Sequence, residues 1–228
     1  MKKTISIIVI LLGFTIAFGQ TADSTYSVST DFKHIIFYAV SDSNSDYYYP
    51  KLEEKAKNNK AGLTTTDCYY LYYGRLFKNE HKGLPFLASP ERMDFDKALA
   101  KSNCKKIINI GVPLLENNPV DLTVLLHTCK CLNDKKDDRW EDYNSLLTNL
   151  LNAIFSEGTG QSPETAIKVV DIEDEHILKG VLGFIGGTES LHKSENLPGR
   201  VFNVWSKGGQ KLYFEELFFE DIEGMELK

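Results

Sequence analysis

Apolar and polar residues are arranged in two different ways along this chain, and the arrangement changes near residue 158. Before this point, apolar residues recur three or four positions apart, as on one face of an amphipathic helix. After it, short runs rich in valine, isoleucine, phenylalanine and tyrosine are separated by glycine turns, which is typical of strands. The pattern predicts a single α+β domain over residues 31–228, mainly helical at 31–157 and β-rich at 158–228.

Local signals predict where several helices begin and end. Thr64 and Asp67 match a capping box, in which two side chains accept hydrogen bonds from free backbone N–H groups of the first turn. Asn118, followed by proline, predicts a helix start. Pro113 predicts a kink or break near Gly111 in the helical pattern of residues 91–117. Residues 51–58 and 143–155 predict two more helices, the second of them ended by a left-handed glycine at 158.

The order helix, Asn-Pro, helix, connector, helix is similar to the helical hairpins of tetratricopeptide repeats, although about one repeat is present. We therefore expect a tetratricopeptide-like α-helical layer first, preceded at residues 31–40 by a short strand or helical turn. A small, mainly antiparallel sheet should follow, from three strands at 166–170, 200–206 and 211–219. Between the first two strands we expect one short helix at 172–182 and a glycine-rich connector at 183–198. Residues 207–210, Lys-Gly-Gly-Gln, predict a hairpin turn.

The first residues have the composition of a cleavable signal peptide. Two lysines precede an apolar run that ends at Phe18, and small residues lie just before Gln20. That run is about 14 residues long, shorter than the roughly 20 that span a bilayer. We expect cleavage after residue 19, a flexible leader at 20–30, and a periplasmic or secreted protein. No cysteine lies near the cleavage point, so a lipoprotein is not expected.

The charge of the remaining chain disfavours nucleic acid as a partner. Loss of the two leader lysines leaves 24 basic residues against 32 acidic ones, a net charge of −8. A phosphate backbone would be repelled by this excess, and no stripe of lysine and arginine offsets it. After signal cleavage we expect no transmembrane segment, and the oligomeric state is left open.

Four cysteines lie in the exported part, at positions 68, 104, 129 and 131. Cys129 and Cys131 are two positions apart on a predicted helix, so their side chains diverge and should not bridge each other. One disulfide between Cys68 or Cys104 and a cysteine of this pair is one interpretation, and buried free thiols are an equal alternative. The paired spacing of a zinc site is missing.

Tyr69, Tyr72 and Tyr73 share one face of the helix that begins after Thr64, together with Leu76. Their rings and hydroxyls could bind a ligand or partner, and they are the candidate binding residues. The alternative, which we favour, is that this face packs in the core with the hydroxyls at its rim.

Other patterns do not converge on a reaction. The Gly158-x-Gly160 turn follows a helix and precedes a strand, the reverse of the order in phosphate-binding loops. The acidic run at 171–175 fans out around a helix and has a sufficient cause in the helix dipole. The five histidines are scattered and no serine elbow is present. We therefore predict no catalytic residue, metal or cofactor.

Several motifs resemble a bacterial family catalogued as domain of unknown function 4919. They are Tyr49-Pro50-x-Leu52, Asp67, Leu71-Tyr72-Tyr73-Gly74, Gly158-x-Gly160-x-Ser162-Pro163-Glu164-Thr165-Ala166, Ile167-x-Val169-Val170 and Glu175. His176 departs from the aromatic residue, usually tyrosine, expected in that family. The resemblance implies an exported bacterial protein and supplies no reaction or ligand.

The leading functional hypothesis is a non-catalytic module of the cell envelope that binds a protein or envelope ligand. It rests on the repeat-like helices, the tyrosine face and the missing catalytic motifs. One alternative is an envelope hydrolase with its site between the helical layer and the Gly158 loop. Another is a structural subunit of an envelope assembly.

Overall fold

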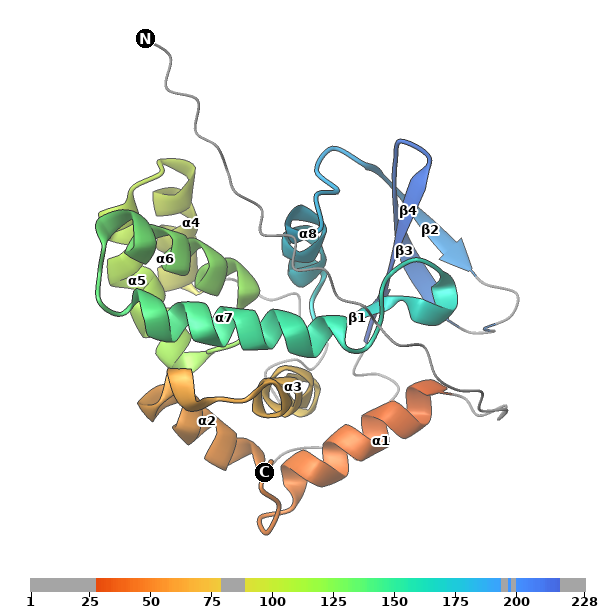
Figure 1. Cartoon of the computed structure of the whole chain (residues 1–228), viewed down its shortest axis with the longest axis horizontal. Helices are drawn as coiled ribbons and strands as arrows, with labels where there is room; N and C mark the ends of the chain where they lie inside the picture. The colour runs from red at the N-terminus through yellow and green to blue at the C-terminus, as the bar shows by residue number, and fades with distance from the viewer. Residues whose placement is uncertain (1–27, 79–88, 194–196, 198–199, 218–228) are drawn as a thin grey trace.

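The computed structural model describes residues 28–78, 89–193, 197 and 200–217, with side chains from residue 32 (Figure 1). Seven helices of the described chain precede the sheet: α1 (Val28–Ser41), α2 (Tyr49–Asn58), α3 (Thr65–Gly74), α4 (Pro90–Ala100), α5 (Cys104–Asn117), α6 (Leu122–Lys135) and α7 (Trp140–Phe155). The β-rich part contains β1 (Ile167–Val169), α8 (Ile172–Val181), β2 (Thr188–Lys193), β3 (Val201–Lys207) and β4 (Gln210–Glu216). The predicted α+β class is confirmed.

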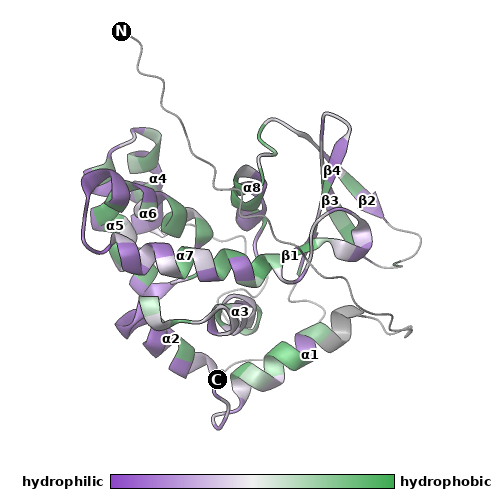
Figure 2. Cartoon of the chain, viewed as in Figure 1, coloured by the Kyte–Doolittle hydropathy of each residue, from purple (hydrophilic) through white to green (hydrophobic). Residues whose placement is uncertain are grey.

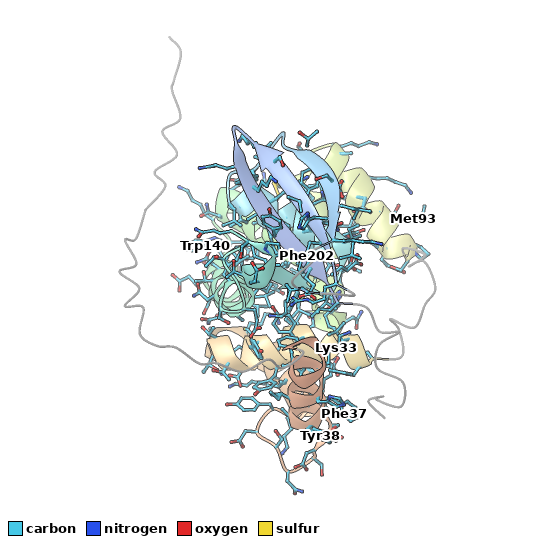
Figure 3. The ribbon with its side chains drawn as sticks, turned by 90° about the vertical axis from the view of Figure 1, so that its right-hand side faces the viewer. Lys33, Phe37, Tyr38, Met93, Trp140 and Phe202 are labelled. Carbon is cyan, nitrogen blue, oxygen red and sulfur yellow. A yellow bond between two sulfur atoms is a disulfide. The ribbon has the colours of Figure 1, made fainter. Side chains whose placement is uncertain are left out.

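The four strands form one sheet in the order β1-β4-β3-β2. β1 pairs in parallel with β4, and the other two pairings are antiparallel, so the sheet is mainly antiparallel as predicted. The predicted hairpin is also present: Gly208 and Gly209 both have positive φ and join β3 to β4. Figure 3 looks onto this sheet, with the helices of the N-terminal part below and behind it.

The connector predicted at residues 183–198 is wrong in part, because it contains β2. All six residues of β2 are exposed, so the strand carries no run of buried apolar side chains that would mark it in the sequence. Backbone pairing with β3 makes it a strand. Pairing with the next strand along the chain leaves little trace in the composition of β2 itself.

Two predicted helix boundaries are also wrong. The break in residues 91–117 lies at Ser102, which has a φ of 49°, and Asn103 then caps α5 by accepting from the Lys106 N–H at 3.2 Å. Pro113 lies inside α5 without ending it. The next helix is capped by Asp121, whose Oδ1 accepts from the Val124 N–H at 2.9 Å, and not by Asn118. Each actual cap supplies a side-chain acceptor at the point where the backbone turns.

The left-handed residue predicted at Gly158, in the turn after α7, lies at Gly160 instead. Gly158 does not have a positive φ; a Cβ there would lie 2.4 Å from the backbone oxygen of Ala166, so close chain approach requires glycine. The left-handed residue is Gly160, with φ +71°. Its N–H donates to Thr165 O at 2.7 Å, and its carbonyl accepts from the Tyr213 N–H at 2.8 Å. The turn therefore ties the end of the helical part to β4.

Residues 31–40, expected to form a short strand or helical turn, lie in the longer helix α1. The predicted capping box of α3 is confirmed. Thr64 Oγ1 accepts from the Asp67 N–H at 3.1 Å, and Asp67 Oδ2 accepts from the Thr64 N–H at 2.8 Å. The signal peptide and residues 20–27 of the predicted leader lie outside the described residues. The tetratricopeptide-like arrangement stays a prediction.

One large apolar core joins the two parts of the chain. It contains Ile36 of α1, Leu71 of α3, Leu125 of α6, Leu150 of α7 and Phe214 of β4, each fully buried. Figure 1 shows α7 running from the helical part toward β1. In the described ranges, no helix combines the length and apolar character needed to cross a bilayer.

Candidate functional site

The junction between helices and sheet is built around the buried carboxyl group of Asp174, in the first turn of α8. The Tyr72 hydroxyl of α3 donates to Asp174 Oδ2 at 2.8 Å and accepts from the Val170 N–H at 3.2 Å. The Arg75 guanidinium lies 3.6 Å from the same carboxylate oxygen and donates to Val120 O at 3.3 Å. This network fastens α8 and the end of β1 to α3.

Ionisation at this junction is governed by burial. Burial raises the pKa of Asp174 to about 7, against the opposing charge of Arg75. Burial by itself would lower the pKa of Arg75, but the raising effects of Asp174, Tyr72, Asp171 and Tyr49 together outweigh it, and the pKa of Arg75 is raised. The Arg75 Nε atom is buried and has no hydrogen-bond partner. Tyr72, Arg75 and Asp174 are buried, and their contacts hold α3 and α8 together.

The other acids of the α8 start have separate partners, as the fanning expected around a helix requires. Glu175 is buried and accepts from Asn203 Nδ2 at 2.9 Å and from the Trp205 indole N–H of β3. Glu173 accepts from Arg92 Nη2 of α4 at 2.6 Å, and Arg92 also pairs with Asp121. The acidic run therefore bonds to three different elements. Among the described residues, no group of three or more histidine, cysteine, aspartate or glutamate side chains is arranged to hold a metal.

The three candidate binding tyrosines all make contacts within the chain. Tyr72 and Tyr73 are fully buried, and the Tyr73 hydroxyl donates to Lys168 O at 3.3 Å. Tyr69 is partly buried and donates to Glu157 Oε1 at 2.6 Å. The structure brings the three rings together in edge-to-face contacts. These positions fit the packing interpretation, and direct binding by the tyrosines stays a prediction.

One of the disulfides that the sequence left open is present in the structure. Cys104 at the start of α5 and Cys131 in α6 form a disulfide with a Cα–Cα distance of 5.1 Å. Cys68 and Cys129 are buried free thiols. Burial raises the pKa of Cys68 to about 12, so this thiol stays protonated and unreactive at neutral pH.

A groove of about 470 Å³ lies between the start of α4, the second half of α5 and the start of α6. Ile110, Pro113 and Leu114 supply its apolar wall, and Arg92 and Asp121 lie at its polar side. The latter two are already paired with each other. The groove begins at Ser89, the residue that precedes α4.

The outer edge of β2 is the most open part of the described sheet. β2 ends the strand order, and β3 is its only strand partner among the described residues. Among the described residues, nine large apolar side chains are exposed, and five of them lie on β2 or on the segments next to it in the chain: Val181 at the end of α8, Leu182 and Ile185 in the connection to β2, Leu191 on β2 and Val201 on β3. Figure 2 shows hydrophobic colouring on the connection from α8 to β2. We call β2 and these five residues the β2 edge; no sequence signal marked it, because its strand was not recognised.

Aromatic and cationic side chains hold α8 over the neighbouring strand. Lys179 Nζ lies 3.0 Å from the centroid of the Trp205 ring, and His176 meets the same ring edge-on at 5.6 Å between centroids. His176 thus packs at the sheet where an aromatic residue was expected. Strand β3, which pairs with β2, is therefore held in place by contacts with α8.

Comparison with known proteins identifies a family without assigning a reaction. No match was found among curated proteins or among solved structures. A family model described as a domain of unknown function, DUF4919, matches residues 34–195. This range contains all the motifs that carried the resemblance, from Tyr49 to Glu175, and it ends before β3. Since the match covers most of the chain, this protein belongs to the DUF4919 family.

Proposed function

We propose that this protein is a non-catalytic interaction module exported to the bacterial cell envelope, and that it binds a protein partner through the β2 edge. The observation that carries the proposal is the exposure of every residue of β2 at the end of the sheet. An edge strand presents a row of backbone N–H and C=O groups to which another strand can be added. Exposed Leu191 supplies an apolar contact at its centre.

The contacts at the junction favour a binding role over a catalytic one. Tyr72, Arg75, Asp174 and Glu175 are buried and bonded to other parts of the chain. The hydrolase alternative places a site between the helical layer and the Gly158 loop. There the Glu157 carboxylate already accepts from Tyr69 and from Lys168. That alternative and the structural-subunit alternative stay predictions.

Export is supported by the signal-like sequence of residues 1–19 and by the Cys104–Cys131 disulfide. Disulfides persist in the periplasm and outside the cell, and are rare in the cytosol. The acidic balance of the chain agrees with a protein partner better than with nucleic acid. We propose a periplasmic or secreted protein that is not lipid-anchored.

Site-specific photo-crosslinking in the native envelope tests this function. A photoreactive residue at Leu191 should give a defined protein adduct, because Leu191 lies at the proposed contact. The control position is Met93, which is also exposed, on α4, a helix that lies at the opposite side of the molecule from β2 (Figure 1). Equal adducts at both positions, or none at Leu191, would count against binding at β2. The intact mass of the recovered protein checks loss of residues 1–19.

A further inference from the structure

We propose that the partner at the β2 edge is a second copy of this chain. The inference rests on the proposed binding role of that edge and specifies its occupant. Two β2 strands would pair antiparallel about a two-fold axis through Leu191, joining two sheets into one. Such an interface uses the same patch on both subunits, so β2 must be complementary to itself.

The sequence of β2 has this self-complementarity. Residues 189–193 read Glu-Ser-Leu-His-Lys, with an acid and a base at equal distances from a central leucine. In the antiparallel register centred on Leu191, Glu189 faces Lys193 of the partner subunit, and the same pair repeats on the other side of the axis. Opposite charges at directly facing positions stabilise a strand pair, and like charges destabilise it.

All three side chains lie on one face of the sheet. Side chains alternate along a strand, so Glu189, Leu191 and Lys193 share a face. Facing residues on β3 belong to the same face, and Leu191 is opposite Asn203 while Lys193 is opposite Val201. In the dimer, the two Leu191 side chains, each 74% exposed in the single chain, would meet between the two charge pairs.

Neighbouring registers lack this match. A shift by one residue places Leu191 opposite Ser190 or His192 of the partner subunit. In the first case Lys193 faces Thr188 of the partner subunit and Glu189 faces its His192. Within the described part of the chain, neither Glu189 nor Lys193 forms an ion pair, so both charges are available for one made between copies.

The test uses reversal of these two charges in the full mature chain. Sedimentation should show the wild type shifting from monomer to twice the monomer mass as concentration rises, since a short strand interface is small and dissociates on dilution. Glu189→Lys and Lys193→Glu should each remain monomeric, because each places like charges opposite one another. Lys211→Glu is the matched control. It reverses an exposed charge on β4, away from the edge, and should dimerise like the wild type.

Restored dimerisation in combined variants distinguishes the Glu189–Lys193 pairing from a general effect of charge on the protein. An equal mixture of the two single variants should form a heterodimer, because each lysine then faces a glutamate. The double variant Glu189→Lys/Lys193→Glu should dimerise by itself for the same reason. Circular dichroism should be unchanged in every variant, as both positions are exposed.

A wild type that stays monomeric at all concentrations, or variants that rescue in neither combination, would overturn the dimer. These results distinguish failure of the dimer from failure of the proposed function. A monomeric wild type that still gives a Leu191 adduct with a different protein overturns the second copy as occupant and leaves binding at β2 in place. Absence of any Leu191 adduct, together with a monomeric wild type, overturns both.

Discussion

Asp174 is held in an environment far from that of an exposed carboxyl group. Its pKa is raised by burial from 3.8 to about 7, while Tyr72 and Arg75 bond to it. Between these two values, the folded protein retains a proton that the unfolded chain has released. The contribution of Asp174 to the free energy of unfolding is therefore full below the unfolded pKa and falls as pH rises through about 7.

Replacement Asp174→Asn should remove this pH dependence, because an amide does not ionise. Urea unfolding from about pH 5 to pH 8 should show the wild type losing about 3 kcal/mol of stability relative to the variant, at ~1.4 kcal/mol per pH unit up to the folded pKa of about 7. His127 is half-buried and has a lowered pKa, so it acts in the opposite direction. It is present in both proteins, and its effect cancels in the difference. Parallel curves for the two proteins would contradict the raised pKa of Asp174.

At the scale of elements, α5 packs tightly against α6 and α4 at Gly111. A Cβ at this position would lie 2.1 Å from Thr128 Oγ1 of α6 and 3.0 Å from the Phe95 ring of α4. Thr128 and Phe95 are both fully buried, so neither can swing aside. The nearby disulfide between Cys104 and Cys131 also limits separation of the two helices. Three helices therefore meet around a single missing side chain.

Gly111→Ala should lower the free energy of unfolding by about 1–3 kcal/mol, the usual effect of overpacking a core. Gly180→Ala is the control on α8, where a Cβ meets nothing within 4 Å. That variant should gain up to about 1 kcal/mol, since alanine is the better helix former. Thermal unfolding of the two variants and the wild type measures both changes in stability. A Gly111→Ala protein as stable as the wild type would show that α5 and α6 can separate freely.

At the scale of the whole molecule, the folded unit extends beyond the family match. The match ends at residue 195, yet β4 lies between β1 and β3 in the sheet. Without β3 and β4, β1 and β2 have no described strand partner. Buried Phe214 and Trp205 would also be lost from the main core.

A chain ending at residue 195 should fail to unfold cooperatively and should be cut rapidly by protease within residues 160–195. The reason is that α8 would lose the Asn203 and Trp205 donors to Glu175, along with the sheet beneath it. A chain ending at residue 217 retains all described strands and is the control. Cooperative thermal unfolding of the shorter chain, at the temperature of the control, would show that β3 and β4 are dispensable.

The candidate site was less accessible from the sequence than the fold. The acidic run at the α8 start was correctly interpreted as divergent, because helical geometry alone spreads consecutive residues. Its partners Tyr72, Arg75 and Trp205 come from segments far away in the chain, so no spacing rule could pair them. The β2 edge was missed because exposed strands lack the apolar alternation by which strands are recognised.

The sequence by itself determined what depends on neighbouring residues. The helical and β-rich halves, the capping box at Thr64 and the glycine hairpin after Lys207 follow from local periodicity, side-chain acceptors and backbone freedom. Only the tertiary structure decided which cysteine bridges Cys104, where Asp174 finds its partners, and that β2 is a strand. The disulfide and the Asp174 contacts join segments far apart in the chain, and their energies arise only when the common core brings those segments together. The strand β2 depends on backbone pairing with β3, which its own exposed side chains do not signal.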